Sequence, residues 1–211
     1  MGLFAALCTM RTHPIPPVTE PLQYRAIGVV RGRYIPNELD HFTRGKVVDS
    51  SGVEVEAVIL GRVLALLKRH VDLEKPHLWV VYPRSRDFDS LHLQISGIWE
   101  PSTLSSEDSK EKDISNGMSD QLQEGDDFFS IRGELIYTKP SARELVIKVR
   151  PSNKNPGKSN IPFKIQIKGE IPQSNLRHFI SLSVRRNCQE LHVEQFEIIA
   201  PMSTRGGKRF N

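Results

Sequence analysis

The chain has 211 residues, of which 38% are hydrophobic and 26% are charged, and its formal net charge is +4. This composition is typical of one large or two small globular domains, and the lack of any run of about 18 apolar residues excludes an ordinary transmembrane helix. Its two cysteines, Cys8 and Cys188, are too few for a disulfide framework, so we expect a reducing compartment, the cytoplasm.

The N-terminal segment predicts an arm without regular structure. Residues 11–23, RTHPIPPVTEPLQ, are rich in proline and have no hydrophobic period. Met1–Met10 is apolar, but no cationic segment precedes it, so we do not expect a secretory signal. We therefore expect residues 1–23 to be a disordered arm.

Residues 24–100 predict a β-rich module with one helix. Residues 59–73 place apolar side chains at helical spacing, and Pro76 follows them. A hairpin is expected around Ser50-Ser51-Gly52 because short alternating segments flank this turn. The expected strands are 26–35, 45–49, 53–58, 78–82 and 91–99.

Residues 101–127 predict a disordered acidic linker. They hold eight acidic residues and two lysines and almost no aromatic side chains. Such a segment buries too little apolar surface to fold by itself. The clearest domain boundary therefore falls here.

Residues 128–200 predict a second β module, followed by a basic tail over residues 201–211. Residues 128–211 hold 15 basic and 6 acidic residues, whereas residues 1–100 hold 12 and 11. An excess of this size can attract polyanions, although it is also what a solubilising surface requires. The expected strands are 128–138, 144–150, 163–171, 178–185 and 191–199.

Three short matches in the same order suggest an internal repeat of a β unit. Arg31-Gly32 parallels Arg132-Gly133, residues 78–82 parallel residues 145–149, and residues 91–97 parallel residues 163–169. The alternation common to all strands is the competing explanation. By this comparison the first module carries an inserted hairpin and helix that the second lacks.

No catalytic, metal or cofactor motif stands out. Pro156-Gly157-Lys158-Ser159 resembles the end of a phosphate-binding loop, but Ser152 replaces the required glycine and no helix follows. The seven histidines are scattered without metal-ligand spacing. We therefore expect a protein that is not an enzyme and that has no cofactor and no metal.

Strand alternation in the second module predicts a basic outer face. In residues 163–168 it buries Phe163, Ile165 and Ile167, and it exposes Lys164, Gln166 and Lys168. The same reasoning on neighbouring strands, and on the end of the fourth strand, gives a set of cations that can follow a phosphate backbone. The predicted nucleic-acid-binding residues are Arg132, Lys148, Arg150, Lys164, Lys168, Arg185 and Arg186.

Five strands in this arrangement resemble an OB-fold barrel over residues 128–199. Residues 24–100 share three strands of that pattern and look like a β-rich relative. The segments YRAIGVVRGRYIP and HLWVVYPR resemble conserved cyanobacterial proteins of unassigned activity. The fold class implied is mainly β, with one inserted helix and two barrel-like modules. OB folds bind single-stranded nucleic acid, oligosaccharides or proteins, so the resemblance alone selects no ligand.

We interpret the chain as a non-catalytic protein that binds single-stranded nucleic acid, RNA in preference to DNA, and that has no membrane partner. The alternative is an adaptor in a protein complex, docking its partner through an aromatic surface of the first module. Trp79, Tyr82 and Trp99 would form that surface.

Overall fold

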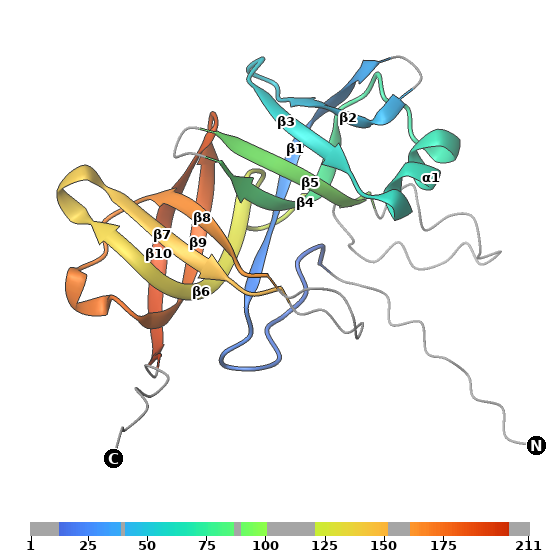
Figure 1. Cartoon of the computed structure of the whole chain (residues 1–211). Helices are drawn as coiled ribbons and strands as arrows, with labels where there is room; N and C mark the ends of the chain where they lie inside the picture. Colours follow the sequence, from blue (N-terminus) through green and yellow to red (C-terminus); the bar gives the residue numbers. More distant parts are fainter. Residues whose placement is uncertain (1–12, 39–40, 87–89, 101–120, 152–160, 203–211) are drawn as a thin grey trace, which may run out of the picture.

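The computed structural model describes residues 13–38, 41–86, 90–100, 121–151 and 161–202. Its ten strands form one continuous sheet that closes into a barrel twice (Figure 1). The first barrel consists of β1 (Arg25–Glu38), β2 (His41–Val48), β3 (Glu54–Ile59), β4 (His77–Ser85) and β5 (Leu91–Ile98). The second consists of β6 (Phe128–Lys139), β7 (Glu144–Val149), β8 (Phe163–Lys168), β9 (His178–Asn187) and β10 (Glu190–Pro201).

The two barrels have the same topology. The first runs β1-β2-β3-β5-β4 and closes from β4 to β1, and the second runs β6-β7-β8-β10-β9 and closes from β9 to β6. The pairings of β3 with β5 and of β8 with β10 are parallel, while the other pairings are antiparallel. This five-stranded Greek-key order is that of an OB fold. The prediction of a mainly β chain with two barrel-like modules is confirmed.

The first module is more complete than its sequence suggested. It has all five strands, and its β2–β3 hairpin corresponds to the β7–β8 hairpin, so this hairpin is not an insertion. The helix α1 spans Gly61–His70, shorter at both ends than predicted, because residue 59 belongs to β3 and a turn at Asp72 stops it. Where α1 precedes β4, the second barrel has only the 3-10 turn η2 (Gln173–Asn175) before β9.

Of the three predicted repeat matches, the topology supports only the one between Gly32 and Gly133. A Cβ on Gly32 would lie 2.6 Å from the carbonyl oxygen of Val48, and a Cβ on Gly133 would lie 2.5 Å from that of Lys148. Each glycine thus lets the second strand of its barrel cross closely over the first. The other two matches were wrong, because they align the fourth strand with a second strand and the fifth with a third.

The barrels join where the first halves of β1 and β6 pair antiparallel. Gly28 pairs with Phe129 across the junction. These two residues are separated along the sequence by the same number of positions as Gly32 and Gly133, which are equivalent residues of the two barrels. Gly28 and Phe129 are therefore equivalent residues that pair with each other. The junction therefore has approximate two-fold symmetry, with its axis passing close to the Gly28–Phe129 pair. Two clefts flank it. One is lined by β1, the end of β2 and the residues just before β6, and the other by β1, β4, the end of β7 and the start of β8.

Parts of the segments expected to be a disordered arm and linker are ordered on the barrels. Residues 1–12, 101–120 and 203–211 lie outside the described residues, but 13–23 and 121–127 pack on the barrels. Ile15 is 7% exposed in a small apolar cluster with Ile27, Val29 and Leu78, and Leu122 packs against it. The outer face of β1 and β4 is apolar at these positions, and the two segments cover it.

Candidate nucleic-acid interface

Three of the predicted cations come together on the outer face of the second barrel. Lys148 on β7 pairs in register with Lys164 on β8, and Lys168 follows two pleats later. We call Lys148, Lys164 and Lys168 the lysine row. Lys164 is exposed and forms no ion pair with any residue that the structure describes. The other two lysines of the row are partly neutralised. Lys148 Nζ lies 3.1 Å from Glu134 Oε2, and Lys168 Nζ lies 3.8 Å from both Glu144 Oε1 and Glu190 Oε1.

Arg132 does not reach the solvent. It is 7% exposed and donates hydrogen bonds to the carbonyl oxygens of Pro21 and Gln23, at 2.6 and 3.2 Å, and to Ser181 Oγ at 3.2 Å. Strand alternation correctly predicted that the Arg132 side chain points away from the core of the second barrel. The N-terminal arm, however, covers that outer surface. The expected exposure of Arg132 is therefore wrong, and its contacts are those of an anchor for the arm.

Arg186 is also internal, at 6% exposure. It donates from Nε to Asp127 Oδ1 at 2.6 Å and from Nη2 to Asp49 Oδ2 at 2.7 Å, so one guanidinium joins the β2–β3 turn to the second barrel. Its neighbour Arg185 donates to both carboxylate oxygens of Glu194, at 2.8 and 3.2 Å, and to backbone carbonyls at Glu124 and Asp126. The contacts of both arginines within the chain leave little capacity for a phosphate.

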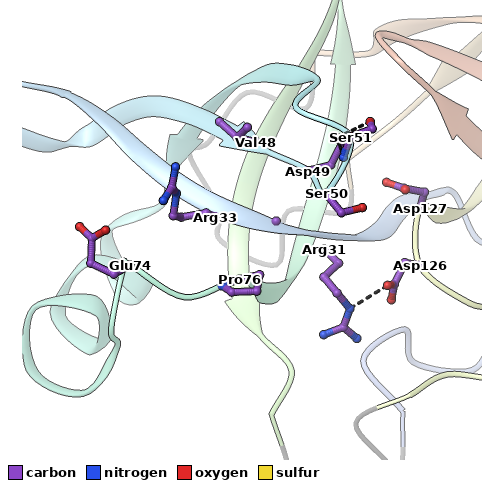
Figure 2. A pocket seen from close by; sticks show the side chains of 11 residues that line it. Arg31, Arg33, Val48, Asp49, Ser50, Ser51, Glu74, Pro76, Asp126 and Asp127 are labelled. Carbon is purple, nitrogen blue, oxygen red and sulfur yellow. Dashed lines mark hydrogen bonds and ion pairs between the residues drawn. The ribbon is translucent and has the colours of Figure 1, made fainter.

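Asp49 and Asp127 belong to the first of the two clefts beside the junction. It measures about 470 Å³ and is lined by four carboxylates and two arginines, which Figure 2 shows from close by. Arg31 Nε donates to Asp126 Oδ2 at 2.7 Å, while Arg33 is exposed. We call this the acidic cleft; it is lined by Arg31, Arg33, Asp49, Glu74, Asp126 and Asp127. Its carboxylates make it unfavourable for a polyanion.

A basic site that the sequence analysis missed lies on the first barrel. A cavity of about 430 Å³ opens on the outer face of β2, β3 and β5. We call it the first-barrel face; the charged and titratable residues that line it are Arg44, Lys46, Glu56, Arg86 and His92. In OB folds the second and third strands, with the loops after the first and fourth, form the usual ligand face. Arg44 and Arg86 make no ion pair within the described part of the chain.

His92 is half-buried on this face. Its Nδ1 is buried without a hydrogen-bond partner among the described residues and lies 3.8 Å from Glu56 Oε2. Burial is the main cause that lowers the pKa of His92; Glu56 opposes it, and Arg86, Arg84 and Arg44 lower the pKa further. The lining of the face holds three cations and one carboxylate, so its formal charge suits an anionic ligand.

The aromatic side chains proposed for a protein-docking surface are covered. Trp79 is 0% exposed, and its Nε1 donates to the Gly32 carbonyl at 2.8 Å in the core of the first barrel. Tyr82 and Trp99 are half-buried against the small cluster around Ile15. The arm therefore covers part of the surface that the adaptor alternative would use.

Two kinds of feature are absent from the described part of the chain, a metal cluster and a membrane-spanning helix. Among these residues, no three His, Cys, Asp or Glu side chains are arranged to hold a metal ion. No described helix is both long and apolar enough to cross a membrane.

Comparison with known protein families matches both barrels. Residues 26–106 match the family described as "PatR RNA-binding protein, N-terminal OB-fold domain". Residues 131–200 match the family described as "Cyanobacterial OB-fold-like RNA-binding domain, C-terminal". No curated protein and no solved structure matches the chain significantly. The chain belongs to the cyanobacterial OB-fold family that these two domain descriptions define. Its first barrel matches the N-terminal description, and its second barrel matches the C-terminal one.

Proposed function

We propose that this protein is a non-catalytic, cytoplasmic RNA-binding protein that holds a single strand on the outer faces of its barrels. The observation that carries the proposal is the first-barrel face, where Arg44 and Arg86 have no carboxylate partner among the described residues, at the position OB folds use for ligands. Both family descriptions name RNA as the ligand of related domains, which supports RNA over DNA.

The charges suggest how the strand is held. Arg44 and Arg86 present planar guanidinium groups that can bind phosphate through two hydrogen bonds, while Lys46 is paired with Glu54 at 2.5 Å. The lysine row offers a second contact, and Lys164 is its member without an acidic partner among the described residues. Contacts of this kind read the backbone, so we expect weak sequence preference and strong dependence on salt.

The test uses the full chain and a fluorescein-labelled oligouridylate of about 12 nucleotides, with binding followed by anisotropy. We expect the plot of log affinity against log salt to be linear, with a slope of about −0.7 for each phosphate contacted. The double variant Arg44→Ser with Arg86→Ser should lose most of the affinity, because it removes the two arginines of the proposed site that have no ion pair in the described chain.

The matched control is Arg33→Ser with Lys75→Ser. These exposed cations change the net charge equally but lie away from the first-barrel face. If both double variants lose affinity alike, the attraction is diffuse charge and the proposed face is wrong. If the unaltered chain binds no oligonucleotide at low salt, the RNA-binding proposal fails. A deoxyribose strand of the same base sequence, used as competitor, measures the preference for RNA.

A further inference from the structure

The second cleft beside the junction has a composition opposite to that of the acidic cleft. It measures about 360 Å³ and lies where β1 and β4 meet the ends of β7 and β8. No Asp or Glu lines it among the residues that the structure describes. We call it the arginine cleft and define it by Tyr24, Arg25, Tyr82, Arg84, Arg150 and Phe163.

The three arginines of this cleft have no acidic neighbour among the cleft residues that the structure describes. None of them forms an ion pair with a described residue. Burial lowers the pKa of Arg25, and the cross-strand neighbour Arg132 lowers it further; burial also lowers the pKa of Arg84. Like charges held together with partial desolvation are unfavourable, so an anion in the cleft would be stabilised.

Aromatic rings lie among these charges. The guanidinium carbon of Arg84 is 3.8 Å from the centroid of the Phe163 ring, and that of Arg150 is 5.8 Å from the Tyr24 centroid. The Tyr24 hydroxyl and Arg25 Nε have no hydrogen-bond partner in the described chain. Unpaired bases of RNA stack on aromatic rings and on guanidinium planes, so this combination suits a nucleotide better than a simple anion.

We propose that the arginine cleft binds one nucleotide of a single-stranded RNA. The base stacks against the Tyr24, Tyr82 and Phe163 group, and the phosphate is held by Arg25, Arg84 and Arg150. The volume is near the lower end of the usual range for small-ligand sites, about 300–1,000 Å³, which suits one unpaired nucleotide and excludes a duplex. This inference rests on the proposed function and places one nucleotide between the two barrels.

The test is ultraviolet crosslinking of the full chain to the same labelled oligouridylate, with the crosslinked residues mapped by mass spectrometry. We expect crosslinks at Tyr24, Tyr82 or Phe163, because crosslinking requires direct base contact. Phe163→Leu keeps an apolar side chain but removes the stacking ring, and it should weaken binding about tenfold.

A second variant, which removes a charge, tests the cleft even if Phe163→Leu does not fold. Arg150→Ala removes an exposed side chain of the arginine cleft, and Arg33→Ala removes an exposed side chain of the acidic cleft. We expect Arg150→Ala to lose at least about fivefold more affinity than Arg33→Ala, because only Arg150→Ala removes a phosphate contact.

The two hypotheses fail in different ways. If the chain binds RNA and loses affinity with Arg44 and Arg86 replaced, but crosslinks map only to the first-barrel face or the lysine row, the cleft inference is overturned and the proposed function stands. Equal effects of Arg150→Ala and Arg33→Ala would overturn it as well. If the unaltered chain binds no RNA, both fail together.

Discussion

The two clefts beside the β1–β6 junction are related by the approximate symmetry of the repeat, yet they carry opposite charge. Arg25 in the arginine cleft is the equivalent of Asp126 in the acidic cleft. The two residues have the same separation along the sequence as the equivalent residues Gly28 and Phe129. Arg31 and Asp126 consequently form an ion pair at 2.7 Å, whereas their counterparts Arg132 and Arg25 are two like charges on neighbouring strands.

This difference indicates separate roles for the two clefts: the acidic cleft holds the barrels together, and the arginine cleft is suited to a ligand. The acidic cleft neutralises three of its four carboxylates within the chain, through Arg186 between Asp49 and Asp127 and through the Arg31–Asp126 pair. The arginine cleft leaves its cations without acidic partners in the described chain. Because a buried ion pair on one side already fixes the barrels, the other side can carry unfavourable charge for a polyanion to neutralise.

The largest effect is expected from Arg186→Met, which removes the central cation of the acidic cleft. The carboxylates of Asp49 and Asp127 would then be partly buried without their partner, and the free energy of unfolding should fall by about 3–5 kcal/mol. Urea unfolding followed by tryptophan fluorescence measures this loss.

Arg33→Met is the control for that experiment, because the exposed Arg33 lines the same cleft without an ion pair in the described chain. Its replacement should change the stability by only a few tenths of a kcal/mol. A loss of similar size in both variants would mean that Arg186 does not hold the two barrels together.

The fold was largely predictable from the sequence because alternation and turn chemistry are local. The Ser50-Ser51-Gly52 turn and the inward side chains of β8 lie where the pattern put them. Barrel closure was not predictable in the first module, because it depends on pairings between distant segments such as β3 with β5. The cover provided by residues 13–23 was missed because a proline-rich segment can pack without any period of its own.

The site was harder to predict because charge alone does not show what a side chain meets. Lys164 was correctly expected on an exposed strand position, but Arg186 points inward at the end of β9 to two carboxylates from other segments. The near balance of charge in residues 1–100 concealed the grouping of Arg44, on β2, with Arg86, which follows the end of β4. Alternation at Arg44 and Lys46 on β2 was the only local signal for that face.

The next effect is expected from Arg25→Asp, which gives the arginine cleft the acid found at the equivalent place in the acidic cleft. The new carboxylate lies opposite Arg132, so a cross-strand ion pair replaces repulsion between two arginines. We expect a change in unfolding free energy within about 1 kcal/mol, because the gained pair offsets the hydrogen bond that Arg25 makes to the Pro16 carbonyl. Oligouridylate affinity should fall by about tenfold or more.

A thermal melt and an anisotropy titration on one sample of the Arg25→Asp variant separate these two effects. If stability is kept and affinity is unchanged, the arginine cleft takes no part in binding. If stability collapses, the two clefts are not interchangeable in charge, and the comparison between them is wrong.

The smallest effect concerns the pH dependence of the acidic cleft. Burial by itself would raise the pKa of Asp49, but hydrogen bonds from Ser51, Arg186 and Val53 lower it to about 2. A carboxyl whose pKa is lower in the folded state stabilises that state above the ordinary pKa of about 4, and this contribution is lost as the pH falls toward 2. Asp49→Asn should therefore be less stable than the unaltered chain at pH 7, by about 1 kcal/mol, because its amide nitrogen cannot accept from Arg186. The difference should narrow steadily between pH 4 and pH 2 in urea unfolding series, since only the unaltered chain gains a proton at this position. A difference that stays constant over that range would show that Asp49 is not held ionised by Arg186, and that the acidic cleft is closed by shape and not by charge.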